Sequence, residues 1–208
     1  MLLLATMKLL DYTYGFHAGT DGQTLLLLHG VGGDENDMTQ VGQLIDPDAS
    51  QLRPKGKVTV DGHARYFTRH AGASFDPLEV ERETADLVGF IDAARTEHSL
   101  SDSQLVAIGY SNGANMIASL LAKHPTVVKK AILFRGMLPV AFLEHPDLTG
   151  VDILLLNGEA DHIMDKVRVA QLHDYLADCG ADVRLHWTKA GHQLASEDIA
   201  IASQWLAP

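Results

Sequence analysis

The alternation of short apolar runs with longer segments of helical periodicity is the feature that most constrains how this chain folds. The apolar runs are Leu25–Leu28, Leu105–Ile108, Ala131–Phe134 and Ile153–Leu156, with a weaker one at Val183–Trp187. Because the middle runs are nearly all apolar, they are typical of strands covered on both faces. The alternation predicts an α/β fold with a mostly parallel central sheet flanked by helices on both faces.

The segments between these runs carry apolar residues at helical spacing. Helices are predicted over Val80–His98, Asn112–Lys123, Asp165–Cys179 and Ser196–Leu206. His124 and Pro125 end the second helix, and Gly180 stands where the third is expected to stop. Met7–Tyr14 predicts an added antiparallel strand at the sheet edge.

Length and charge exclude several classes of protein. The 208 residues favour a single domain spanning 1–208, and 46% hydrophobic residues with 21% charged residues are ordinary globular composition. The net charge is −11, and we find no basic stripe of the kind that nucleic-acid binding needs. The same charge disfavours anionic membrane surfaces. We therefore expect neither nucleic acid nor membrane as a partner.

The chain has one cysteine, Cys179, so it has neither an internal disulfide nor a CxxC metal or redox site. The apolar start, Met1–Leu10, is short, and Lys8 follows the apolar run, which argues against a signal peptide. No stretch reaches the roughly 18 apolar residues of a membrane helix. We expect a cytoplasmic protein with no membrane insertion and no metal.

The strand predicted at Leu105–Ile108 runs into Gly109-Tyr110-Ser111-Asn112-Gly113, which has the form G-x-S-x-G. Such a serine projects from a sharp strand-to-helix turn, and the two glycines remove side chains that would clash there. The helix that begins at Asn112 points its positive end at the reacting centre. The motif predicts Ser111 as a nucleophile.

A serine nucleophile needs a base, and the base needs an orienting acid, in the chain order Ser, Asp or Glu, His. The strand Ile153–Leu156 leads to Asp161, and Val183–Trp187 leads to His192. Both residues follow strands at their carboxyl ends, where α/β sheets gather ligands. The predicted catalytic residues are Ser111, Asp161 and His192.

Four other residues compete for these roles. Glu159 ranks second as the acid because it follows its strand so closely, and Asp165 is better interpreted as a helix N-cap. His162 adjoins the acid and cannot easily face it, and His186 lies inside a predicted strand.

The strand Leu25–Leu28 runs into the glycine-rich stretch His29-Gly30-Val31-Gly32-Gly33. Such a loop lets a backbone amide approach the substrate oxygen. We predict an oxyanion hole from the amides of Val31 and Asn112. The phosphate-binding patterns G-x-x-x-x-G-K-[ST] and G-x-G-x-x-G are both absent from this loop.

These motifs resemble the phospholipase/carboxylesterase family of α/β-hydrolases, the small esterases without a cap domain. The resemblance runs from Leu25 to Leu206 and rests on Leu28–Glu35, Pro54-Lys55-Gly56, Arg65-Tyr66-Phe67, Gly109–Gly113, Asn157–Asp161 and Gly191-His192. It implies the α/β-hydrolase fold and cofactor-free hydrolysis of short acyl esters through Ser111, His192 and Asp161. Lys55 departs from the arginine of many relatives, and we interpret it as part of a surface turn.

The resemblance implies a small-molecule ester as the substrate, and the sequence hardly constrains which one. With little room for a lid, the site is expected to be shallow and to suit short acyl groups. Side chains predicted near it are Phe75, Met137, Leu138, Ile163 and Met164. Small relatives often pair through surface helices or an edge strand, so the resemblance allows a homodimer.

Alternative functions either use the same three residues, need no catalysis, or use a different nucleophile. Lysophospholipase and acyl-protein thioesterase activities occur among relatives and need the same three residues. A non-catalytic binding protein would need a broken triad, which this sequence does not have. A cysteine hydrolase of the dienelactone type is excluded because Ser111 occupies the turn and Cys179 lies at a helix end.

Overall fold

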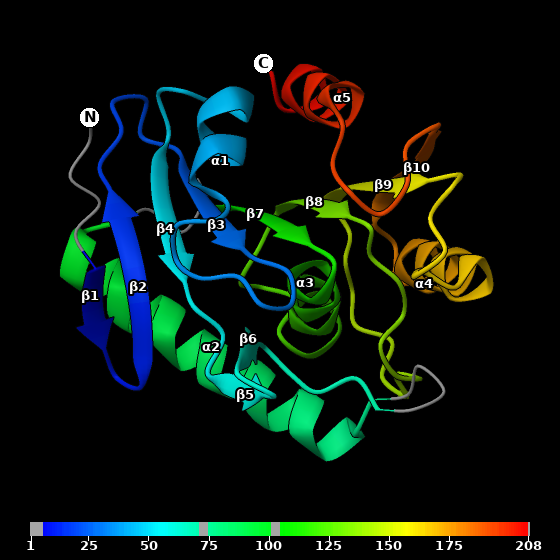
Figure 1. Ribbon diagram of the computed structural model, residues 1–208, viewed down its shortest axis with the longest axis horizontal. Helices are drawn as coiled ribbons and strands as arrows, with labels where there is room; N and C mark the ends of the chain where they lie inside the picture. The colour runs from blue at the N-terminus through cyan, green and yellow to red at the C-terminus, as the bar shows by residue number, and fades with distance from the viewer. Residues whose placement is uncertain (1–5, 71–74, 101–104, 208) are drawn as a thin grey trace.

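The computed structural model describes residues 6–70, 75–100 and 105–207. Its main sheet has eight strands in the order β1-β2-β4-β3-β7-β8-β9-β10, and β2 alone runs against the others (Figure 1). The strands are β1 (Thr6–Leu9), β2 (Tyr12–His17), β3 (Thr24–Leu28), β4 (Ser50–Pro54), β7 (Leu105–Tyr110), β8 (Lys130–Phe134), β9 (Asp152–Gly158) and β10 (Asp182–Thr188).

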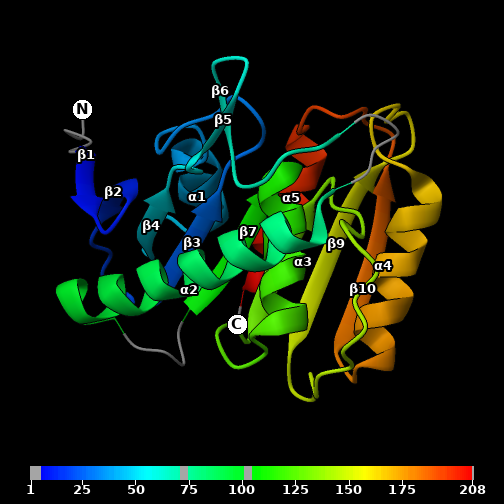
Figure 2. The ribbon, with the colours of Figure 1, turned by 90° about the horizontal axis from the view of Figure 1, so that it is seen from below.

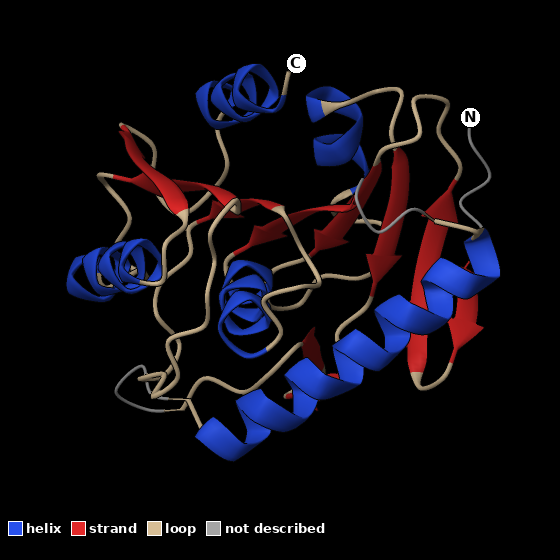
Figure 3. Cartoon of the chain, turned by 180° about the vertical axis from the view of Figure 1, so that it is seen from behind, coloured by secondary structure: helices blue, strands red, loops and turns tan. Residues whose placement is uncertain are grey.

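Helices cover both faces of this sheet (Figures 1 and 3). One face carries α1 (Thr39–Ile45) and α5 (Ser196–Leu206), and the other carries α2 (Pro77–His98), α3 (Asn112–Lys123) and α4 (Lys166–Asp178). Leu26 and Leu28 pack into the core beneath α2, α3 and α4, and Leu25 and Leu27 pack into the core on the α1 and α5 side. The α/β fold with a mostly parallel sheet is confirmed.

The predicted edge strand at Met7–Tyr14 is a hairpin of two strands, so the single-strand prediction was wrong. Residues Leu10 and Asp11 reverse the chain between β1 and β2, with Leu10 at φ 51°. Neither residue is a glycine or an asparagine, the usual sequence signals of such a turn. β2 pairs antiparallel with β4, and β1 forms the edge.

Sequence patterns did not predict β4, α1 or a small two-stranded sheet of β5 (Val58–Val60) and β6 (His63–Arg65). This small sheet stands off from the main one (Figure 2). It reaches the glycine-rich loop after β3, because the Gly32 amide donates a 2.8 Å hydrogen bond to the Ala64 carbonyl.

The register brings the carboxyl ends of the central strands together. Leu28 lies opposite Gly109, Tyr110 opposite Phe134, and Gly158 opposite Thr188. The segments that follow β3, β7, β8, β9 and β10 therefore meet at one edge of the sheet, as ligand-binding loops do in parallel α/β sheets.

Gly113, in the first turn of α3, fixes how closely this helix approaches β3. A Cβ atom there would collide with the carbonyl oxygens of Leu28 and His29, and backbone atoms cannot move aside cheaply. We predict that Gly113→Ala lowers the free energy of unfolding by about 1–3 kcal/mol, measured by urea denaturation.

Gly89 is the matched control, because it lies on the exposed side of helix α2 and a Cβ there meets nothing within 4 Å. Gly89→Ala should stabilise the protein by roughly 0.5–1 kcal/mol, since alanine is the better helix former. Equal effects of the two substitutions would contradict this description of the β3–α3 contact.

Candidate active site

Ser111 occupies the sharp turn between β7 and α3. Its φ of 54° and ψ of −111° lie outside the usual regions for an L-residue with a side chain. The Ser111 amide donates a 2.8 Å hydrogen bond to the Phe134 carbonyl, which extends the β7–β8 pairing into the turn. The strained backbone is thus held by the neighbouring strand, as is common where a side chain must be presented for chemistry.

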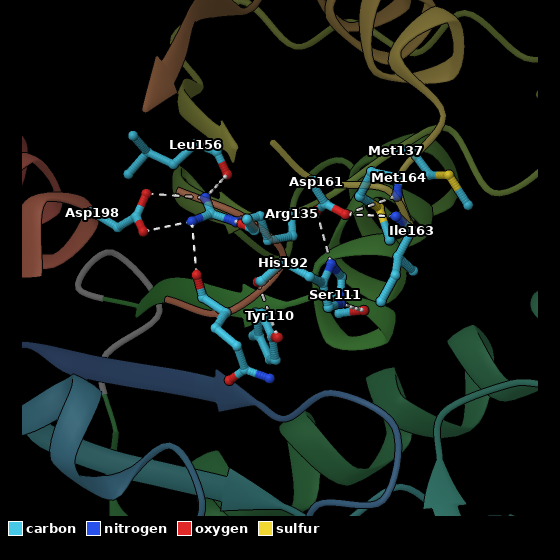
Figure 4. A network of polar contacts seen from close by, with 12 residues as sticks. Tyr110, Ser111, Arg135, Met137, Leu156, Asp161, Ile163, Met164, His192 and Asp198 are labelled. Carbon is cyan, nitrogen blue, oxygen red and sulfur yellow. Dashed lines mark hydrogen bonds and ion pairs between the residues drawn. The ribbon is translucent and has the colours of Figure 1, made fainter. Parts of the chain in front are cut away.

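His192 lies between Ser111 and Asp161 (Figure 4). Its Nδ1 is 2.8 Å from Asp161 Oδ2, and its Nε2 is 3.1 Å from Ser111 Oγ. Because an ionised carboxylate only accepts hydrogen bonds, Nδ1 carries the proton of the neutral ring. Nε2 is then free to accept the serine proton. The structure thus brings the three predicted residues into one chain of hydrogen bonds.

The surroundings of Asp161 favour its charged form. Burial raises the pKa of this carboxyl, but the hydrogen bond from His192 and those from the amides of Ile163 and Met164 outweigh it, so the net shift is downward. The two amides donate to Oδ1 over 2.7 and 3.1 Å, leaving Oδ2 to His192. The segment after Asp161 therefore orients the carboxylate toward the imidazole.

The competing residues do not take part in this chain of hydrogen bonds. Glu159, His162 and His186 are exposed. The Asp165 carboxylate accepts a 2.9 Å hydrogen bond from the Val167 amide and caps α4, as predicted. His173 pairs with Asp174 on an exposed part of α4.

The amides of Val31 and Asn112 have no hydrogen-bond acceptor among the described residues, and both residues line the hollow that contains Ser111. Asn112 begins α3, where the first amides of a helix lack internal partners. Two unpaired donors beside a serine are what an oxyanion hole requires.

Side chains that the sequence did not single out hold the loop carrying Val31. The buried ring of His29 accepts a 2.9 Å hydrogen bond from the Gly56 amide at Nε2, so its Nδ1 carries the proton and donates to the Gly30 carbonyl over 2.6 Å. Burial lowers the pKa of this histidine, which keeps it neutral. The Tyr66 hydroxyl donates to the Pro54 carbonyl over 2.7 Å.

Asn112 has a second task through its side chain. Its Oδ1 accepts from the Tyr66 amide over 2.7 Å, and its Nδ2 donates to the Phe67 carbonyl over 3.0 Å. The motifs Pro54-Lys55-Gly56 and Arg65-Tyr66-Phe67 thus support the site through their backbone. This role depends on a hydrogen bond between two residues that lie 46 positions apart in the chain, and the spacing of motifs in the sequence does not reveal such a bond.

The hollow at Ser111 has a volume of about 360 Å³. Phe75, Ile163 and Met164 line it as expected from their positions, whereas Met137 and Leu138 are not among its lining residues. Met137 is fully buried and its amide donates to Asn115 Oδ1 over 2.9 Å, and Leu138 packs against the core. The sequence did not single out Arg69, Asn115 and Gln193, which supply polar groups to the hollow.

Arg135 holds the loop that carries His192, and sequence analysis did not identify it. It follows β8, is completely buried and forms an ion pair with Asp198 of α5 over 2.6 Å (Figure 4). Its Nε donates to the Gly191 carbonyl over 2.9 Å and its Nη2 to the Gln193 carbonyl over 3.2 Å. Because these carbonyls flank His192, Arg135 fixes the backbone on both sides of that residue.

Two further contacts complete this arrangement. The Tyr110 hydroxyl donates to the His192 carbonyl over 3.1 Å. Asp198 also accepts from the Thr188 hydroxyl over 3.0 Å and from the Ala195 amide over 2.8 Å, so it joins the end of β10 to the start of α5. The loop is anchored at both ends and along its middle.

The described ranges, 6–70, 75–100 and 105–207, contain neither a metal-binding cluster nor a membrane-spanning helix. No group of three or more His, Cys, Asp or Glu side chains in them is arranged to hold a metal ion. No helix in this part of the chain is both long enough and apolar enough to cross a membrane. Cys179 is buried at the end of α4, away from the turn that carries Ser111.

The α/β sheet and its serine turn define the protein as a hydrolase of the α/β type. The model of the dienelactone hydrolase family matches residues 63–204. The chain belongs to this family, although Ser111 and not a cysteine occupies the turn between β7 and α3, and the resemblance to α/β-hydrolase esterases is confirmed.

One related protein and two solved structures agree with this membership. The chain is 38% identical to MhqD of Bacillus subtilis (strain 168), over 91% of this chain and 95% of that protein. It is similar to the Bacillus cereus carboxylesterase, with a TM-score of 0.90 and 35% identity over 93% of this chain and 92% of the other. YahD, solved with malic acid, has a TM-score of 0.89 and 30% identity over 94% and 98% of the two chains.

The Arg135–Asp198 pair yields a stability prediction. Arg135→Met leaves a buried carboxylate without its cation and should lower the free energy of unfolding by about 3–5 kcal/mol, measured by urea denaturation. Adding Asp198→Leu to this variant should recover part of the loss, because the unpaired charge is then removed.

Lys123, paired with Glu144 over 2.7 Å at the surface, serves as the control. Lys123→Met should cost less than about 1 kcal/mol. If Arg135→Met and Lys123→Met lower the free energy of unfolding by the same amount, the buried pair does not have the stabilising role proposed for it.

Proposed function

We propose that this hydrolase is a serine carboxylesterase that cleaves small acyl esters through an acyl-enzyme intermediate. The observation that carries the proposal is the hydrogen-bonded series Ser111 Oγ, His192 and Asp161, with distances of 3.1 and 2.8 Å. The unpaired amides of Val31 and Asn112 support it, since they can hold the oxygen that becomes negative during acyl transfer.

In the first half-reaction, Ser111 Oγ bonds to the ester carbonyl carbon while His192 Nε2 takes the hydroxyl proton. The carbonyl oxygen becomes an oxyanion held by the two amides. The bond to the alkoxy oxygen then breaks, and His192 gives its proton to that oxygen. An alcohol leaves, and the acyl group stays on Ser111.

In the second half-reaction, water takes the place of the alcohol. His192 accepts a proton from the water as its oxygen bonds to the acyl carbon, and the proton then passes to Ser111 Oγ as that bond breaks. The carboxylic acid leaves. Asp161 stays ionised and stabilises the imidazolium in both steps, and its lowered pKa suits this role.

The size and lining of the hollow favour small acyl groups. About 360 Å³ is at the low end for small-molecule sites. Val31 and Ile163 at its rim are about half exposed, so the site is open to solvent. Phe75, Ile163 and Met164 offer apolar contact to a short chain.

Polar groups in the same hollow favour acyl groups that carry a hydrogen-bond acceptor. Arg69 Nη2 donates to the Ile163 carbonyl over 3.1 Å, which holds the guanidinium at the rim. Asn115 Oδ1 accepts from the Met137 amide, so its Nδ2 is the group left for a ligand. The similar protein YahD was solved with malic acid, which carries carboxylates. A hydroxy or carboxylate substituent on the acyl group fits these two donors.

Two alternative functions keep the same chemistry, and a third discards it. A lysophospholipase or an acyl-protein thioesterase needs a long apolar channel, and about 360 Å³ with polar groups in the wall favours the esterase. A non-catalytic binding protein does not require His192 within hydrogen-bond distance of both Ser111 and Asp161.

Removing the nucleophile tests the proposal directly. Ser111→Ala should lower kcat on p-nitrophenyl acetate by at least about a thousandfold, because no acyl-enzyme can form. The circular dichroism spectrum should match that of the native protein, and the melting temperature should stay within a few degrees of the native value. A correctly folded variant with native turnover would end the proposal.

A chain-length series separates the esterase from its alternatives. With p-nitrophenyl esters, kcat/KM should be highest for acyl groups of two to about six carbons, since longer chains outgrow the hollow. A value that rises steadily to twelve or more carbons would favour the lysophospholipase. A matched thioester cleaved faster than its oxygen ester would favour the thioesterase.

A further inference from the structure

A second hollow lies beside the one that contains Ser111. It has a volume of about 260 Å³ and shares three lining residues with its neighbour: Val31, Tyr110 and Gln193. On its own side it is lined by Asp37, Met38, Val41 and Leu194, together with Gly30. The ester substrate of the proposed reaction has two parts that need space in the site, an acyl group and an alcohol group.

We propose that this second hollow binds the leaving alcohol of the ester and that Asp37 selects alcohols that carry a positive charge. The inference rests on the proposed function, because it concerns the same reaction at Ser111. It names a separate subsite and a class of substrate: esters of amino alcohols or of quaternary ammonium alcohols.

His192 and Ser111 line the first hollow, and the second hollow adjoins it at Gln193. The leaving oxygen must lie next to His192 Nε2, since the imidazole returns the serine proton to it. The residues that directly follow His192, Gln193 and Leu194, both line the second hollow. An alcohol group that departs on this side of Ser111 therefore has the second hollow within reach.

Gly30 lets the glycine-rich loop pack closely against Tyr110 where the two hollows meet. A Cβ atom at this position would lie 2.9 Å from the ring of Tyr110 and 3.6 Å from Ser111 Cβ. The Tyr110 ring is itself fixed, because its hydroxyl donates to the His192 carbonyl. A side chain at position 30 would therefore push the loop or the Tyr110 ring away and change the shape of both hollows.

The two hollows differ in charge. Arg69 lines the first and Asp37 lines the second. Asp37 is exposed, and its carboxylate has neither an ion-pair partner nor a hydrogen-bond donor among the residues that the structure describes. Tyr110 adds an aromatic ring to the same hollow, and cations bind both to carboxylates and to aromatic faces. An ester with its cation on the alcohol side matches this polarity.

The test compares two acetate esters of the same shape, acetylcholine and uncharged 3,3-dimethylbutyl acetate. We measure the ratio of their kcat/KM values in the native protein and in Asp37→Asn, which removes the charge and keeps the shape. The ratio should fall by about two- to fivefold in the variant, the size expected for the loss of a solvent-exposed ion pair, because the Tyr110 ring remains. Added salt should weaken the native preference.

Asp174→Asn, on an exposed part of α4, is the matched control for the change in net charge, and it should leave the ratio unaltered. Both esters give the same acetyl-enzyme, so the effect should appear in kcat/KM and not in the rate of deacylation. An equal ratio in native protein and Asp37→Asn overturns the inference while leaving the esterase proposal intact. Turnover of both esters by Ser111→Ala would instead overturn the proposed function.

Discussion

The buried ion pair between Arg135 and Asp198 is the interaction on which the end of the sheet that carries Ser111 and His192 depends. All five N–H groups of the guanidinium are used: two meet the carboxylate, and the others meet the carbonyls of Leu156, Gly191 and Gln193. One side chain thus connects the end of β8 to β9, to the His192 loop and to α5. Such a pair is costly to desolvate, and complete hydrogen bonding of both partners offsets that cost.

The same edge shows a repeated backbone device. Ser111 follows β7 and Arg135 follows β8, and each has a φ of 54°. The Ser111 amide bonds to the Phe134 carbonyl, and the Arg135 amide bonds to the Leu156 carbonyl, both over 2.8 Å. Each strained residue is therefore held by a carbonyl at or near the end of the neighbouring strand. The sheet supplies the rigidity that lets two unfavourable backbone conformations persist, and both are used to present a side chain.

Sequence patterns predicted the parts of the fold that apolar burial controls. The runs at Leu25–Leu28 and Ile153–Leu156 form strands that were predictable because every residue in them is apolar and can be buried on either face of the sheet. β4 was missed because it contains Gln51 and Arg53, which are buried only because they bond to each other and to the Glu35 carbonyl. Partners that lie far away in the chain leave no periodic signal.

The residues of the candidate site likewise fall into those that sequence patterns could predict and those that they could not. Ser111, Asp161 and His192 were predictable because the order of strands fixes which residues reach one edge. Met137 and Leu138 were expected at the pocket from loop position alone, and the hydrogen bond from the Met137 amide to Asn115 ties that segment to the core instead. Arg135 could have been suspected only as a charged residue at the end of an apolar strand, a weak signal without Asp198 beside it.

The central claim is that Ser111 is the activated nucleophile of this hydrolase. Reaction with a fluorophosphonate, followed by peptide mass spectrometry, measures this most directly, since such reagents capture serines activated by a neighbouring base. The account predicts one adduct per chain, on the peptide that contains Ser111, with loss of esterase activity in proportion to labelling. Inactivation with the adduct on another residue, or full labelling of Ser111 with activity retained, would contradict it.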